Sequence, residues 1–203
     1  LPATQSCYER SAGSTLSSGV TATSYFAMGM QEASRANGWY NGFNFNTYRD
    51  TGMDTEKTNE LSREAIDERL SYFSRNPGYA ARFYLQKHLP QWADGSYASR
   101  QATLATYGGR SAFFESLYSG SASGFYIEYC NVYQNMLYLG ALLFALSALR
   151  RREDSLPLYL GMIAVLGGFL FHILWEANAR YIFLYSLLLM PYAAYGLSLA
   201  HKR

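Results

Sequence analysis

The sequence predicts a mainly α-helical integral membrane protein, a helical bundle fragment with three transmembrane helices near the C-terminus. Three runs without a charged side chain support this class, and they cover residues 132–149, 156–175 and 181–200. A helix needs roughly 20 apolar residues to cross a hydrocarbon core of about 30 Å. The second and third runs reach that length, whereas the first has a polar start at Gln134 and Asn135.

The composition of these runs also fits helices that pack against one another in lipid. Small residues let transmembrane helices approach closely, and the runs contain Gly140, Gly161, Gly167, Gly168 and Gly196. Pro191 is tolerated because neighbouring helices can satisfy the freed backbone groups. The competing prediction is a buried helical hairpin of a soluble protein, which three uncharged runs separated by short charged turns disfavour.

The basic residues predict the orientation in the membrane. Three arginines at 150–152 separate the first two runs, and a Lys-Arg pair at 202–203 follows the third. Positively charged residues stay on the cytoplasmic side, so the turn over 176–180 should face outward. The sequence therefore predicts an extracytoplasmic region over 1–131 and a transmembrane region over 132–203, in the cell membrane.

Two helices are predicted before the membrane region. One covers residues 55–73, and its apolar face carries Leu61, Ala65, Leu70 and Phe73. The other begins at Pro77, where proline is tolerated in a first turn, and ends at Trp92. Turn-forming residues dominate 37–54, which predicts irregular structure. The Gly- and Ser-rich stretch 93–125 predicts a long loop over the membrane surface.

The second of these helices has two unlike sides. Its aromatic and apolar side carries Tyr79, Phe83, Tyr84, Leu85 and Trp92. Its basic side carries Arg82, Lys87 and His88. A helix with this pattern can lie in the membrane interface, and the competing interpretation is a stripe of aromatic core residues.

The start of the chain predicts a fragment. Residue 1 is Leu1 rather than Met, without the basic start and apolar stretch of a signal peptide. We therefore expect a longer protein whose N-terminal part carries the outer region across the membrane. The two cysteines, Cys7 and Cys130, both fall in the outer region, where an oxidising exterior would permit a disulfide. Two unrelated thiols are the equal alternative.

Charge and motifs exclude several function classes. A formal net charge of +2 gives no concentrated basic face, so no nucleic-acid partner is expected. A Walker-type loop, GxSxG, HExxH and a paired CxxC are all absent from the sequence. The histidines at positions 88, 172 and 201 are scattered, so neither a metal site nor a cofactor is predicted. Metal dependence of the longer protein stays open.

The most informative segment is the turn Trp-Glu-Ala-Asn-Ala-Arg-Tyr at residues 175–181. An arginine at this depth could bind a phosphate through its planar fork. The flanking Trp175 and Tyr181 suit an aromatic belt at a membrane surface equally well, so anchoring and ligand binding are equal alternatives. His172 lies about one turn inside the helix and is predicted to be a hydrogen-bonded packing residue rather than a catalyst.

The segment 171–197, which contains this turn, resembles the C-terminal signature of bacterial multi-pass glycosyltransferases. These enzymes are similar to the protein O-mannosyltransferases and lipid A aminoarabinose transferases of the C-type, polyprenyl-phosphate-sugar-dependent superfamily. Upstream stretches resemble the same group in order and spacing: residues 26–30, 38–42, and 77–79 followed by Lys87 and 91–95. The resemblance therefore covers nearly the whole chain.

The resemblance implies a membrane enzyme that moves a sugar from a polyprenyl-phosphate carrier to an extracytoplasmic glycan, lipid or protein of the cell envelope. The family's catalytic carboxylate lies in the first external loop, so no catalytic residue is expected in this chain, which should be inactive alone. Arg180 would bind the phosphate, and Glu176 would hold that arginine or touch the sugar. Tyr181, Trp175 and Trp92 would stack on the sugar or prenyl chain. A structural ion pair between Glu176 and Arg180, four residues apart on a helix, is the equal alternative.

The alternative function is a non-catalytic membrane protein, either part of a transporter or a membrane-anchored binding module. A transporter should show more polar groups or broken helices at mid-membrane, where only His172 and Pro191 stand out. A binding module should have a compact outer domain, whereas 1–131 is rich in irregular aromatic stretches. Hydrophobic segments upstream, with an acidic pair in the first external loop, would favour the glycosyltransferase.

Overall fold

The computed structural model describes residues 10–11, 13, 19–106, 108–152 and 155–201. In these parts of the chain the regular structure is helical and no strand occurs, which confirms the predicted fold class. The helices are α2 (Ala22–Gly29), α3 (Phe43–Asp50), α4 (Thr55–Arg75), α5 (Pro77–Trp92), α6 (Ser99–Thr106), α7 (Ala112–Tyr118), α8 (Ser123–Arg151), α9 (Leu156–Leu174), the 3-10 turn η1 (Ala179–Tyr181) and α10 (Ile182–His201).

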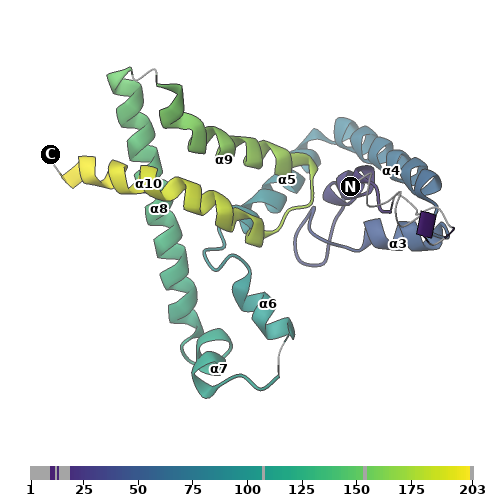
Figure 1. Cartoon of the computed structure of the whole chain (residues 1–203), viewed down its shortest axis with the longest axis horizontal. Coiled ribbons are helices and arrows are strands. Elements are labelled where there is room, and N and C mark those ends of the chain that lie inside the picture. The colour runs from purple at the N-terminus through teal and green to yellow at the C-terminus, as the bar shows by residue number, and fades with distance from the viewer. Residues whose placement is uncertain (1–9, 12, 14–18, 107, 153–154, 202–203) are drawn as a thin grey trace.

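The last three helices are long and apolar enough to cross a membrane. α9 and α10 lie within about a residue of their predicted bounds. α8 begins at Ser123, ahead of the predicted start at 132. Gln134 and Asn135, which made the predicted start uncertain, therefore lie inside a continuous helix. In Figure 1 these helices occupy one end of the molecule, and α3 and α4 occupy the other, with α5 between them.

α8 and α10 pack most closely where two glycines face each other. A Cβ atom at Gly196 would collide with the carbonyl of Gly140, and one at Gly140 would lie 2.6 Å from the carbonyl oxygen of Ala193. The two backbones are therefore in direct contact, as the small residues predicted. Gly167 is the exception, because nothing lies within 4 Å of its would-be Cβ and it faces open space.

α9 packs on α10 through two tyrosines of α10 whose side chains fill the space beside glycines of α9. The hydroxyl of Tyr192 accepts a hydrogen bond from the backbone N–H of Gly161 at 3.0 Å. The ring of Tyr185 lies where a Cβ of Gly168 would be. α10 is continuous through Pro191, as predicted for a proline in a packed membrane helix.

α4 begins and ends where its sequence signals predict. Asp54 accepts hydrogen bonds from the backbone N–H groups of Glu56 and Lys57, which satisfies free donors in the first turn. The predicted apolar face of α4 was right for Phe73, which is buried, but wrong for Leu61 and Leu70, which are exposed. The side that packs inward carries Thr58 and Ser62 beside Phe73. Hydroxyls on α4 are buried because they find partners. The Ser62 hydroxyl lies 2.8 Å from that of Ser24 on α2.

Short helices occur in both segments predicted to be irregular, so those two predictions were wrong. α3 lies within residues 37–54, and α6 and α7 lie within 93–125. Each has only seven or eight residues, too few to show a hydrophobic period. Contacts with the rest of the chain stabilise them instead; for example, Arg100 of α6 donates to the carbonyl of Tyr118 in α7 at 2.6 Å.

Candidate functional site

The turn between α9 and α10 is covered by segments that are far away in the sequence. Trp175 stacks on Tyr25 of α2, with ring centroids 5.1 Å apart, and the edge of Phe26 meets the same indole. The backbone N–H of Ala177 donates to the carbonyl of Gly38 at 2.9 Å. The turn is therefore fixed by α2 and by the segment that follows it.

Sequence stretches singled out by the resemblance pack against this turn and against α4 and α5. Trp39, from the stretch 38–42, packs in one buried cluster with Ala98, Ala177 and Ala179. Met30, at the end of the stretch 26–30, packs with Phe83 of α5 and Phe73 of α4 in a second cluster. The stretches 26–30 and 38–42 therefore contact the turn directly, whereas Tyr79 of the stretch 77–79 packs in the second cluster.

Lys87 of α5 links α2 to α9. Its side chain is completely buried, and Nζ donates to the carbonyls of Gly29 at 2.6 Å and Ile173 at 2.9 Å. These carbonyls belong to the last turns of α2 and α9, where the negative ends of both helix dipoles lie. A Cβ at Gly38 would lie 2.6 Å from Cε of Lys87, so the Lys87 side chain leaves no room for a side chain at residue 38.

Burial lowers the pKa of Lys87 from 10.5 to about 7. The two carbonyl acceptors at helix ends favour the charged ammonium and oppose this shift, so burial is the larger effect. The predicted basic side of α5 was therefore wrong for this residue, since Lys87 points into the protein. No pattern in the sequence indicates the burial, because both acceptors are backbone atoms of distant segments.

Arg180 lines a cavity of about 370 Å³ at the mouth of α9 and α10. The other lining residues are mainly aromatic and aliphatic: Phe171, His172, Trp175, Tyr181, Leu184 and Tyr185. The guanidinium donates to the hydroxyl of Tyr181 at 3.4 Å and lies over the ring of that residue. Among the described residues, no carboxylate forms a salt bridge with Arg180, so its charge is available to a ligand.

Glu176 is buried and does not line this cavity. Its side chain is 4 % exposed, and Oε1 has no hydrogen-bond partner in the described part of the chain. Burial raises the pKa of this carboxyl, and the nearby charge of Arg180 opposes the rise. Residue 176 is not helical, so the expected helical i,i+4 pair with Arg180 is absent. Glu176 can influence that guanidinium only at longer range.

His172 behaves as predicted for a packing residue. It is buried, and its Nδ1 lies 2.9 Å from the carbonyl oxygen of Glu176. Its ring stacks on Tyr181, with centroids 5.4 Å apart. His172 therefore holds the turn and the wall of the cavity in place.

Trp92 lies away from the other predicted site residues. Its indole packs between Phe169 of α9 and Tyr185 of α10, and its carbonyl accepts hydrogen bonds from Gln134 and Tyr138 of α8. It thereby joins α5 to all three long helices. The cavity is lined by Trp175, Arg180 and Tyr181 but not by Trp92, which reaches it only through Tyr185.

A second cavity, of about 500 Å³, shares Arg180 with the first. Its other lining residues are Gly95, Ser96, Tyr97, Ser99, Tyr126, Cys130 and Phe183. Sequence reasoning placed Gly95 in a motif but missed the polar residues, since they come from a segment predicted to be a loop and from the start of α8. The predicted partner of Cys130, Cys7, lies outside the described residues.

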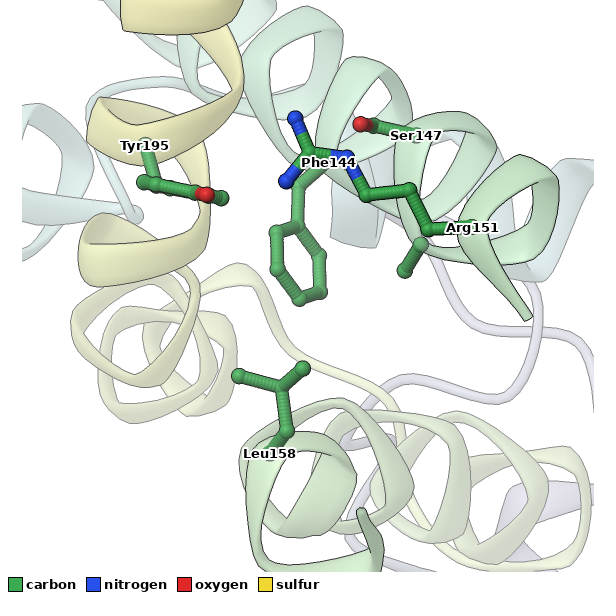
Figure 2. A pocket seen from close by; sticks show the side chains of 6 residues that line it. Phe144, Ser147, Arg151, Leu158 and Tyr195 are labelled. Carbon is green, nitrogen blue, oxygen red and sulfur yellow. The ribbon is translucent and has the colours of Figure 1, made fainter. Parts of the chain in front are cut away.

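Two further cavities lie at the other end of the long helices. Figure 2 shows the smaller one, of about 130 Å³, where the ring of Phe144 points toward Leu158 and Arg151 runs along the same side of α8. A larger, mostly apolar one of about 730 Å³ lies between α8 and α9 beside Arg152. Neither contains a predicted site residue.

No group of three or more His, Cys, Asp or Glu side chains that could hold a metal ion occurs in the described part of the chain. No protein-family model, curated protein or solved structure matches this sequence. The family resemblance stated from the motifs therefore stays a prediction, and the geometry of the site carries the argument about function.

Proposed function

We propose that this chain is the C-terminal portion of a membrane glycosyltransferase that moves a sugar from a polyprenyl-phosphate carrier to an acceptor in the cell envelope. One observation carries the proposal: Arg180, without a salt-bridge partner among the described residues, lines an aromatic and aliphatic cavity at the mouth of two membrane-spanning helices. A polyprenyl phosphate has the matching chemistry, an anionic head on a long apolar chain.

The position of each group in the cavity supports this ligand. A guanidinium can bind two phosphate oxygens at once. Leu184 and Tyr185 continue the wall one turn further along α10, in the direction of the hydrocarbon core, where a prenyl chain would lie. Trp175 and Tyr181 flank the arginine and suit the boundary between head group and chain.

The proposed role of Arg180 in the reaction is electrostatic. When the acceptor hydroxyl displaces the carrier, the phosphate leaves with additional negative charge on its oxygens. A fixed cation in a site that excludes much of the water stabilises that charge. The general base that takes the proton of the acceptor is assigned, on the resemblance alone, to a part of the longer protein outside this chain.

The test is sugar transfer from radiolabelled polyprenyl-phosphate sugars in membranes that contain the full-length protein. Arg180→Ala should lower the rate of transfer by roughly 100- to 1,000-fold, the usual cost of removing one donor to a developing anion. Arg180→Lys should recover only part of the rate, because an ammonium lacks the planar fork. Arg151→Ala is the matched control and should transfer at the wild-type rate, because Arg151 lies in the last turn of α8 and lines neither cavity that contains Arg180.

Two results would contradict the proposal. Normal transfer by Arg180→Ala, at normal protein levels in the membrane, would remove the phosphate role of this residue. Absence of transfer from every donor, despite correct insertion of the wild-type protein, would favour a non-catalytic membrane protein.

A further inference from the structure

We propose that the second cavity, which shares Arg180 with the first, binds the sugar of the carrier lipid. This inference rests on the proposed function, because it takes the phosphate to lie at Arg180. The sugar is bonded directly to that phosphate, so it must occupy space beside the guanidinium. Arg180 belongs to the walls of both cavities, of about 370 and 500 Å³, and the sugar can enter the second while the prenyl chain follows the first.

Both cavities are mostly apolar, and the second adds hydroxyl-bearing residues from α6 and α8 beside Arg180. In the second cavity the hydroxyls of Ser99 and Tyr126 lie 3.1 Å apart, whereas the hydroxyl of Ser96 already donates to Asp94 and that of Tyr97 is buried. Hydroxyls both donate and accept hydrogen bonds, as the hydroxyls of a sugar do. The volume also lies within the range of about 300–1,000 Å³ that is typical of small-molecule sites.

The backbone beside the second cavity is held in an unusual conformation. Tyr97 and Ala98 are consecutive non-glycine residues with φ of 51° and 59°, in the left-handed region that side chains disfavour. Asp94 stabilises this turn: Oδ1 accepts from the backbone N–H and the hydroxyl of Ser96, at 3.0 and 2.6 Å, and Oδ2 accepts from the N–H of Ala98 at 3.0 Å. Backbone held in such conformations concentrates at ligand sites.

On another side of the cavity, the 94–98 turn and α6 pack directly against α8. A Cβ on Gly95 would collide with the carbonyl of Cys130, so the turn lies directly against α8. The hydroxyls of Ser99 and Tyr126 lie 3.1 Å apart, which joins α6 to α8 and presents two polar groups side by side. Phe183 of α10 meets the ring of Tyr97 edge to face at 5.6 Å and provides an apolar surface.

The experiment compares the binding of four lipids to the purified full-length protein in detergent. One is bare polyprenyl phosphate, and the others are polyprenyl-phosphate hexoses with glucose, mannose or galactose. We expect at least one hexose lipid to bind more tightly than the bare lipid. Ser99→Ala and Tyr126→Phe should each weaken binding of that hexose lipid roughly 2- to 12-fold, as for one lost hydrogen bond. Neither should change binding of the bare lipid, which also shows that the variants are folded.

Tyr129→Phe is the matched control, because Tyr129 lies one turn further along α8, is exposed and does not line the cavity. A second measurement uses Cys130 in a Cys7→Ser background. The hexose lipid should slow alkylation of this cavity-lining thiol more than the bare lipid does.

The possible outcomes separate the two proposals. Tight binding of bare and hexose lipids alike, unchanged in Ser99→Ala and Tyr126→Phe, would overturn the sugar site and leave the carrier site intact. Failure of the wild-type protein to bind any of these lipids would overturn both.

Discussion

Replacing Lys87 with methionine should destabilise the protein, and the loss should grow with pH. Methionine fills a similar volume but leaves the buried carbonyls of Gly29 and Ile173 without a donor. Each unsatisfied group costs about 1–2 kcal/mol, so the free energy of unfolding should fall by about 2–4 kcal/mol when the lysine is neutral. At roughly 2–4 °C per kcal/mol, the midpoint of thermal unfolding should drop by about 4–16 °C.

The pH dependence follows from the lowered pKa of Lys87. With a folded value of about 7 and an ordinary value of 10.5, the folded state binds fewer protons than the unfolded state between these limits. Stability therefore rises with pH in this window, at up to about 1.4 kcal/mol per pH unit. From pH 7 to pH 9.5 the gain is about 3 kcal/mol, and Lys87→Met should lack it.

The assay is the fraction of detergent-solubilised protein that stays monodisperse on size exclusion after heating, at pH 7 and pH 9.5. Arg82→Met is the control, because Arg82 lies on the same helix but is exposed. The difference in midpoint between wild type and Lys87→Met should be larger at pH 9.5. A difference that stays constant or shrinks as pH rises would refute the assignment of Lys87 as a buried, neutral donor.

Two other substitutions test the packing of α8 on α10 and the burial of Glu176. Gly196→Ala should lower the thermal midpoint clearly, because its Cβ would collide with the Gly140 carbonyl. Gly167→Ala should leave the midpoint within about 2 °C of wild type, since its Cβ meets open space. Equal shifts in the two variants would contradict the close contact. Glu176→Gln should keep or raise the midpoint at pH 7, because a raised carboxyl pKa means that the charged form is penalised above that pKa, and the amide never carries the charge. A loss of more than about 5 °C in the same heating assay would mean that the carboxylate is satisfied.

Long periodic segments were the predictable part of this fold. The apolar runs predicted α9 and α10 nearly to the residue, and α5 was predicted at its observed bounds from Pro77 and its aromatic pattern. α3, α6 and α7 were not predictable, because seven or eight residues carry no clear period and their stability comes from contacts. The inward face of α4 was also missed, since Thr58 and Ser62 are buried through hydroxyl partners rather than apolar character.

The candidate site was predictable in its residue types but not in its arrangement. Sequence reasoning chose Trp175, Arg180 and Tyr181, and the structure places all three on one cavity. Sequence reasoning could not separate Glu176 from these residues, because the turn was equally compatible with a helix. Glu176 is buried and does not line the cavity. Trp92 was grouped with them by residue type alone, whereas its position depends on how α5 crosses the long helices.

The tryptophans of the protein all lie at joints between segments. Trp39 packs against the α9–α10 turn, Trp92 packs between α9 and α10, and Trp175 stacks on Tyr25 of α2. This chain contains three tryptophans, and each of them reports on one of these joints. Indole emission shifts to longer wavelength when the ring meets water. The fluorescence of these tryptophans therefore reports, without an added label, whether α2 and α5 are packed on α9 and α10.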